Sequence, residues 1–144
     1  MKLTLKWLQE HDACRSGINW YLEQGTTDFI DLLKRARDAG RFHDFRWCYA
    51  RRVDRKTRIL WACYAAELVL PTWEVKHPDD DRPRKAIDAA RKCAIRKTAK
   101  NRAAADAADA AANAANAAYS ADAAAYAAAY AIMDYGINLL DGNA

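Results

Sequence analysis

The sequence predicts an all-α fold: a single-domain, multi-helix array that ends in an alanine-rich C-terminal helical hairpin. Between residues 103 and 131, 20 of 29 positions are alanine, and none is glycine or proline. Alanine has the highest helix propensity because its side chain loses no entropy on ordering. Elsewhere apolar residues recur at helical spacing, and no convincing segment alternates apolar and polar residues as a strand does. At 144 residues the chain is long enough for one domain, 1–144, with a substantial core.

Residues 1–81 are expected to form aromatic-rich helices joined by tight turns. Two short apolar segments at helical spacing come first, at residues 3–8 and 18–22. A helix that begins near Phe29 is expected to take Thr26 or Thr27 as its N-cap and to stop at Gly40.

The next two helices are predicted by an aromatic spacing and a capping aspartate. Aromatic residues at steps of three and four indicate a helix over residues 42–52: Phe42, Phe45 and Tyr49. Asp54 is the expected N-cap of a helix over residues 57–70. Pro71 is expected to end or kink that helix, because proline has no N–H to donate. The apolar stripe of this helix comprises Ile59, Ala62, Cys63, Ala66, Val69 and Leu70.

A loop rich in proline and aspartate separates this part from residues 82–144, which are expected to form a basic helix and the alanine-rich helical tail. Its expected structural residues are Pro78, Asp81, Arg82 and Pro83. Pro78 disfavours helix before it, Asp81 can cap the helix that follows, and Pro83 suits a first helical turn. We expect the basic helix to run from about Pro83 to Thr98.

Ion pairs should hold this loop in place. We expect Asp79 or Asp80 to pair with arginines of residues 51–58, so that the two halves of the chain stay in register. The three consecutive aspartates could instead hold a divalent cation, but arginines adjoin them and no glycine-containing calcium loop follows.

The alanine tract should pack as a helical pair against large side chains. A polar stripe follows steps of four and three: Arg102, Asp106, Asp109, Asn113, Asn116 and Ser120. A shifted stripe continues it: Asp122, Tyr126, Tyr130 and Asp134. One uninterrupted helix of about 40 residues, from the alanine tract to the end of the chain, would be about 60 Å long, which is too long for a compact domain of this size. We therefore expect a break between Asn113 and Ser120. The five tryptophans all lie within residues 1–81 and should pack over the alanines.

Charge is unevenly distributed. All 23 lysines and arginines and 14 of the 19 acidic residues lie in residues 1–102, giving 23 − 14 = +9, and residues 103–144 carry −5. An electropositive face of this kind suits an acidic protein surface or phosphates. It comprises two clusters: Arg51, Arg52, Arg55, Lys56, Arg58, and Arg91, Lys92, Arg96, Lys97, Lys100, Arg102.

Residues able to bind metal or act as nucleophiles are scattered. His11 and Cys14 have ligand-like spacing, but no second pair lies near them in sequence. No acyl-transfer motif surrounds any cysteine, and Cys63 is expected to be a small buried hydrophobe. We therefore expect no metal site, no cofactor and no catalytic residue.

The compartment is expected to be the cytoplasm. The four cysteines are far apart, without a Cys-x-x-Cys pair, and no secretory apolar segment begins the chain. The only long apolar run is the alanine tract, which its aspartates and asparagines make unsuitable for a membrane.

A family resemblance lies in residues 67–91, which read Glu-Leu-Val-Leu-Pro-Thr-Trp-Glu-Val-Lys-His-Pro-Asp-Asp-Asp-Arg-Pro-Arg-Lys-Ala-Ile-Asp-Ala-Ala-Arg. This segment resembles the signature of the bacterial and phage "putative immunity protein" family, whose members have Val-Leu-Pro, then Pro-x-Asp-Asp-Arg-Pro-Arg-x-Ala-Ile, then a long alanine-rich tail. Ala13-Cys14 followed by Gly17 is similar too. Asp88 stands where the family has glutamate. The resemblance implies neutralisation of a toxin by binding, and no catalytic motif comes with it.

The leading hypothesis is a non-enzymatic, stoichiometric inhibitor of an acidic protein target. That target would be a toxin or, if the protein is phage-borne, a host-defence nuclease or a nucleoprotein complex such as a CRISPR effector. The expected partner-binding residues are Arg91, Arg96, Lys97, Lys100, Arg102, Tyr126 and Tyr130. The alternatives are a nucleic-acid-binding accessory protein that uses the same basic residues, and a small enzyme. Self-association through the alanine tract is a further alternative.

Overall fold

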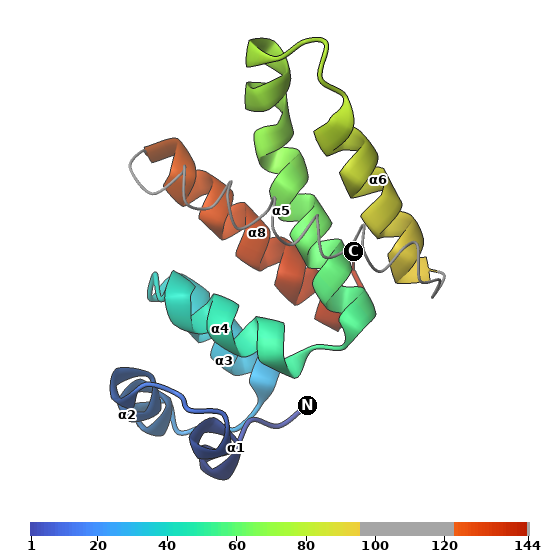
Figure 1. Cartoon of the computed structure of the whole chain (residues 1–144). Coiled ribbons are helices and arrows are strands. Elements are labelled where there is room, and N and C mark those ends of the chain that lie inside the picture. Colours follow the sequence, from blue (N-terminus) through green and yellow to red (C-terminus); the bar gives the residue numbers. More distant parts are fainter. Residues whose placement is uncertain (96–122, 144) are drawn as a thin grey trace.

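The chain is all-α, as predicted. The computed structural model describes residues 1–95 and 123–143, and within them the chain forms seven helices and no strand (Figure 1). The helices are α1 (Leu5–Glu10), α2 (Arg15–Glu23), α3 (Phe29–Asp38), α4 (Phe42–Arg52), α5 (Arg55–Lys76), α6 (Arg82–Ile95) and α8 (Ala123–Asp141). The expected break between Asn113 and Ser120, and the hairpin that depends on it, lie outside the described residues.

Side-chain caps determine where several helices begin. Asp54 caps α5 as predicted, since its carboxylate accepts from the backbone N–H groups of Lys56 at 2.8 Å and Thr57 at 3.1 Å. The N-cap of α3 is Asp28, whose carboxylate accepts from Asp31 N at 3.0 Å, so the expectation of Thr26 or Thr27 is wrong. The reason is an extended pairing of the chain's first residues with residues 26–29. In it Leu3 N donates to Thr27 O and Phe29 N donates to Met1 O, both at 2.8 Å.

Pro71 was expected to end or kink this helix, and the first alternative is wrong because α5 continues through Pro71 for five more residues. Pro71 is exposed, and its ring lies away from the buried face of the helix. The turn that follows is held to α6 by the guanidinium of Arg84, whose Nε and Nη2 each donate to the Glu74 carboxylate at 2.7 Å. This partly exposed ion pair adds modestly to the burial of Leu70 against α6, and together these contacts counter the loss of the backbone hydrogen bond at the proline.

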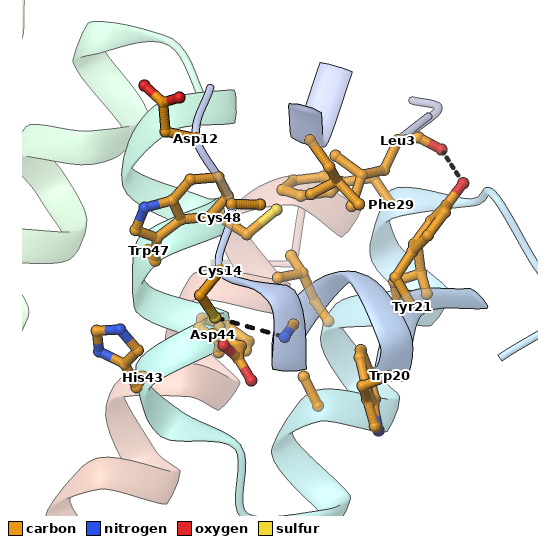
Figure 2. Close-up of a pocket in the computed structure, with 17 residues that line it drawn as sticks. Leu3, Asp12, Cys14, Trp20, Tyr21, Phe29, His43, Asp44, Trp47 and Cys48 are labelled. Carbon is orange, nitrogen blue, oxygen red and sulfur yellow. Dashed lines mark hydrogen bonds between the residues drawn. The ribbon is translucent and has the colours of Figure 1, made fainter. Parts of the chain in front are cut away.

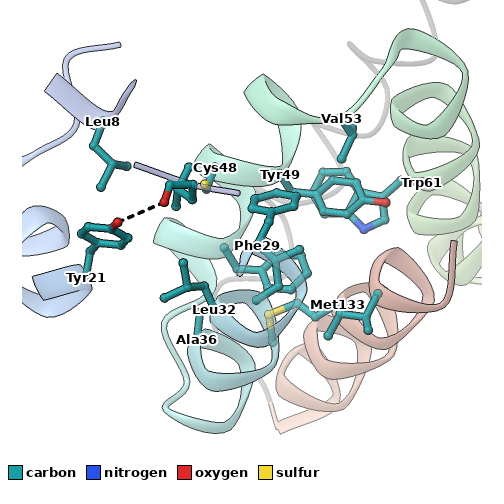
Figure 3. Packing of buried hydrophobic residues seen from close by; sticks show 14 residues of the cluster. Leu8, Tyr21, Phe29, Leu32, Ala36, Cys48, Tyr49, Val53, Trp61 and Met133 are labelled. Carbon is teal, nitrogen blue, oxygen red and sulfur yellow. Dashed lines mark hydrogen bonds between the residues drawn. The ribbon is translucent and has the colours of Figure 1, made fainter. Parts of the chain in front are cut away.

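Two apolar cores share helix α5. The first lies among α3, α4, α5 and α8, with α1 and α2 packed on its outer side (Figures 1 and 3). Its largest fully buried side chains are Phe29, Phe45 and Tyr49. The second core fills the contact between α5 and α6 and consists of Ile59, Cys63, Ala66, Leu70, Ile87, Ala90 and Cys93. Cys63 is fully buried, as expected of a small hydrophobe.

Helix α8 approaches α4 and α5 closely through its backbone. Trp61 Nε1 donates to Ile132 O at 2.8 Å, and Tyr49 Oη donates to Gly136 O at 2.9 Å. The absence of a side chain at Gly136 leaves room for both rings. Tyr49 and Trp61 therefore pack against the backbone of α8 around Gly136. The expected packing of tryptophans over the alanine tract falls mainly outside the described residues. Among the described helices, none has the length and apolar character that a membrane crossing requires.

Candidate protein-interaction surface

Arg91, the first residue of the expected partner-binding set, forms an ion pair with an acidic residue of the same chain. Its Nε and Nη2 donate to the carboxylate of Glu67 on α5 at 2.8 and 2.6 Å. This hydrogen bonding raises the pKa of Arg91 above its ordinary value. The charge of Arg91 is therefore largely neutralised within the molecule. The other expected cations, Arg96, Lys97, Lys100 and Arg102, lie outside the described residues.

The two expected interface tyrosines belong to α8. Tyr130 is 38% exposed, and its ring meets that of Phe42 edge-on at a centroid distance of 5.2 Å. Tyr126 falls in the first turn of α8, but its side chain lies outside the described part of the structure. Tyr130 thus covers part of α4 and still presents area to solvent, and its role in binding stays a prediction.

The loop between α5 and α6 is tied by local ion pairs. The Asp80 carboxylate accepts from Nε and Nη2 of Arg82, both at 2.8 Å, and these bonds lower the pKa of Asp80 to about 2. The expected pairing of Asp79 or Asp80 with residues 51–58 is therefore wrong for Asp80. The physical reason is the 22-residue helix α5, which spans about 33 Å between those arginines and the loop.

The other expected loop residues lie around the start of α6. Asp81 immediately precedes the helix, and its carbonyl accepts from Lys85 N at 3.0 Å. Its carboxylate pairs with Lys85 Nζ at 2.6 Å. Pro83 lies in the first turn of α6, as expected, and Pro78 is exposed in the loop.

Four arginines where α4 meets α5 are held by neutral acceptors. The bonds are Arg51 Nη1 to Trp47 O at 3.4 Å, Arg52 Nη2 to Lys2 O at 3.0 Å, Arg55 Nη2 to Cys93 Sγ at 3.1 Å, and Arg58 Nη1 to Ala50 O at 2.9 Å. Two are also held over indoles, since the guanidinium of Arg51 lies 4.6 Å from the Trp47 ring and that of Arg52 lies 5.8 Å from the Trp7 ring. Such contacts fix a guanidinium in place without neutralising it.

These arginines form a cluster with two neighbouring cations. We call Arg46, Arg51, Arg52, Arg55, Lys56 and Arg58 the α4–α5 cation cluster. Within the described residues, none of the six has a carboxylate within 4.0 Å. The nearest acid in sequence, Asp54, is used in capping and also accepts from the Thr57 hydroxyl at 2.6 Å. Residues 51–58 therefore carry 5 − 1 = +4 charges.

Arginines elsewhere in the described structure are paired differently. Six of them contact a carboxylate: Arg35, Arg37, Arg41, Arg82, Arg84 and Arg91. An ion pair cancels most of the field of both partners at a distance, whereas a carbonyl or thiol acceptor leaves the net charge intact. The α4–α5 cation cluster is therefore the main site of uncompensated positive charge in this part of the molecule.

A groove of about 530 Å³ lies beside this cluster, between α4, α5 and α8. Arg46, Arg51 and Arg58 contribute to its lining, together with His43 and Trp47 of α4. Apolar side chains line the rest, among them Ala62, Ala65, Ile132 and Met133. The groove thus combines an apolar lining with cations from two helices.

A second cavity, of about 290 Å³, lies between the α1–α2 layer and helices α3 and α4 (Figure 2). Cys14 lines it, and this exposed thiol caps α2: its sulfur lies 3.3 Å from Ser16 Oγ and accepts from Gly17 N at 3.4 Å. Both bonds lower the pKa of Cys14. His43 and Asp44 line the same cavity, and Asp44 pairs with Arg41. Among the described residues, no three histidine, cysteine or acidic side chains are grouped to hold a metal ion.

Both basic clusters are visible in the sequence, and the expected partner-binding set takes its cations from the second, in which the structure shows Arg91 paired with Glu67. A signal for this pairing is present in the sequence. Glu67 and Glu74 are seven residues apart, as are Arg84 and Arg91, and two antiparallel helices joined by the loop bring them together. Equal spacing of opposite charges on consecutive helices therefore indicates which arginines are neutralised.

Comparison with protein families gives one match over more than half of the chain. The model described as "Imm-5 like putative immunity protein" matches residues 49–136. This range contains α5 and α6 and all the cluster arginines of residues 51–58. Comparison with curated proteins and with solved structures gives no match. The chain belongs to the Imm-5 like putative immunity protein family.

Proposed function

We propose that this protein is a non-enzymatic inhibitor that binds a protein toxin stoichiometrically and neutralises it, and that the α4–α5 cation cluster is its docking surface. Family membership supports the immunity-type role. The observation that carries the docking surface is the set of four arginines held by neutral acceptors. Guanidinium groups that are already positioned lose little further entropy on binding carboxylates.

The proposed mechanism has two parts. Uncompensated positive charge speeds the encounter with an acidic target, because complementary fields steer association. Apolar contacts beside the cluster, with Tyr130 as one contributor, then lengthen the lifetime of the complex. Occlusion of the target's working surface neutralises it without chemistry. If the protein is phage-borne, a host-defence effector in the host cytoplasm takes the place of the toxin.

The cations Arg96, Lys97, Lys100 and Arg102 are also proposed to contribute to binding of the target. Arg91 is proposed to support it indirectly, by holding α6 to α5 through Glu67. The proposed unit is a single domain. A measurement of its mass in solution tests whether it self-associates through the alanine tract.

Affinity capture from the native host, with and without nuclease, tests this proposal. We expect one stoichiometric protein that survives nuclease treatment. Co-expression of that protein with its inhibitor should restore growth, and the association rate should fall with salt more than the dissociation rate rises. Loss of all partners after nuclease treatment would instead assign the basic surface to nucleic acid, whose affinity falls by orders of magnitude with moderate salt.

A further inference from the structure

We infer that the groove between α4, α5 and α8 is a docking site for an acidic, amphipathic segment of the protein target. The carboxylates of that segment would lie against Arg46 and Arg51, and its apolar side chains would lie on the lining between α5 and α8. This inference rests on the proposed function and specifies the chemistry of the partner.

The charge of the groove favours an acidic occupant. Arg51 and Arg58 are each fixed to a backbone carbonyl of α4, and Arg46 is exposed on the same helix. None of the three meets a carboxylate within the described residues. Two of these arginines come from α4 and one from α5, so together they can pair with several acids of one bound segment. Charge complementarity therefore favours a ligand that carries negative charge.

The lining of the groove favours an apolar face on the same ligand. Ala62, Ala65 and Ala129 have short side chains, which create the concavity, and Ile132 and Met133 complete it. A volume of about 530 Å³ accommodates several aliphatic or aromatic side chains. Amphipathic helices bind grooves of this kind by inserting a row of apolar residues at helical spacing. A purely acidic segment would leave this lining exposed to water.

The tryptophans of the groove favour a protein segment over a nucleic acid. Bases bind single-strand sites by stacking on open aromatic faces. The guanidinium of Arg51 covers the Trp47 ring at 4.6 Å, and Trp61 is only 9% exposed, with its indole N–H bonded to Ile132 O. One face of Trp47 is therefore already occupied by a cation of the protein itself, and Trp61 is buried, which disfavours stacking of bases in this groove.

Four labelled probes test the inference on the full-length protein by fluorescence anisotropy. They are an acidic amphipathic peptide of about 16 residues, long enough for about four helical turns, a scrambled peptide of the same composition, polyglutamate, and oligothymidine. We expect the amphipathic peptide to bind at least about tenfold more tightly than the other three. Its binding should shift the indole resonance of Trp47 in the NMR spectrum.

Charge variants locate the site. Arg46→Glu/Arg51→Glu should weaken binding of the amphipathic peptide by about tenfold or more, and Arg46→Gln/Arg51→Gln by less. The matched control is Arg15→Glu/Lys76→Glu, which makes the same charge change at two exposed positions outside the groove and should alter binding less than about twofold. Circular dichroism checks that every variant is folded.

Several results would overturn the inference. They are equal binding of the scrambled peptide, preferred binding of oligothymidine, equal losses in the groove and control variants, or no binding of any probe. Failure of this inference can be distinguished from failure of the proposed function. If a captured target still binds Arg46→Glu/Arg51→Glu with full affinity, neutralisation stands and the groove is not its site. If the peptide binds in the groove but no target protects growth, the proposed function fails alone.

Discussion

The hydroxyl of Tyr49 donates a hydrogen bond of 2.9 Å to the backbone carbonyl of Gly136, 87 residues further along the chain. This bond connects α4 to the C-terminal helix at a point where no side chain intervenes. The ring of Trp61 lies against that of Tyr49 at a centroid distance of 4.6 Å. The position of α8 therefore depends on one residue that has no Cβ.

Substitution of Gly136 by alanine should destabilise the protein. A Cβ there would lie 3.1 Å from Trp61 Nε1 and 3.2 Å from Tyr49 Cε2, so both rings would have to shift. Alanine gains about 1 kcal/mol in helix propensity, but overpacking costs about 1–3 kcal/mol. We expect the free energy of unfolding to fall by about 1 kcal/mol in urea denaturation. Gly17→Ala is the control, because its Cβ would meet its neighbours at an ordinary 3.4 Å; an equal loss there would refute the steric explanation.

The stability of the fold should decrease at alkaline pH through Cys48. Burial raises the pKa of this thiol from 9.0 to about 12. Between these values the native state keeps a proton that the unfolded chain loses, so the group's contribution is complete below pH 9.0 and is lost as pH rises to about 12.

The expected slope from this group is at most about 1.4 kcal/mol per pH unit. Urea denaturation at several alkaline pH values should show a shallower decline for Cys48→Ala, although this variant starts from lower stability. Well above pH 9.0, Cys14→Ala should retain the wild-type slope, because the lowered pKa of Cys14 leaves this thiol deprotonated in both the native and the unfolded state there. Parallel declines for wild type and Cys48→Ala would contradict the assignment.

Cys14 should be the most reactive thiol of the four. It is exposed, whereas Cys48, Cys63 and Cys93 are buried, and the hydrogen bond with Ser16 contributes most to lowering its pKa. Ser16→Ala should therefore move the pH–rate profile of alkylation to higher pH, and Ser16→Thr should keep it. Mass spectrometry of iodoacetamide-treated protein identifies the modified residue. Identical profiles for the three proteins would show that the hydroxyl has no influence.

The pair of Arg91 and Glu67 should contribute modestly to folding. Both side chains are more than a third exposed, at 37% and 39%, so solvent screening limits the coupling to about 0.5 kcal/mol. A double-mutant cycle of Arg91→Ala and Glu67→Ala measures this value by urea denaturation. Lys92→Ala with Glu67→Ala is the control and should show no coupling. A coupling of zero for Arg91 would leave its charge available to a partner.

Local signals in the sequence predicted most of the described helices. The aromatic spacing gave residues 42–52 for α4, and a single aspartate marked the start of α5. The errors arose where contacts between residues far apart in sequence determine the start or the end of a helix. Asp28 caps α3 where Thr27 pairs with the chain's first residues. Helix α5 passes Pro71 where it packs on α6, with Leu70 buried against that helix and Glu74 paired with Arg84. Helix propensity is a local property of the sequence, so it does not reflect either of these contacts.

The candidate surface was predicted only in part. Clusters of arginine are visible in sequence, but their availability depends on which helix faces them. The register of α5 against α6 neutralises Arg84 and Arg91, and no comparable acid lies opposite Arg51 or Arg58 in the described structure. The acceptors of the latter two are backbone carbonyls, which sequence does not position.

Helix α5 belongs to both apolar cores, and this has a consequence for how the native state fluctuates. Trp61 anchors it among α4 and α8, while Cys63 and Leu70 face α6. Detachment of α6 would expose only the second core, so the amides of α6 can exchange with solvent deuterium through a partial opening that leaves Trp61 in place. The amides around Trp61 require a larger opening. The backbone amides of α6 should therefore be less protected from hydrogen exchange than those of α5 around Trp61, although the two helices are in contact.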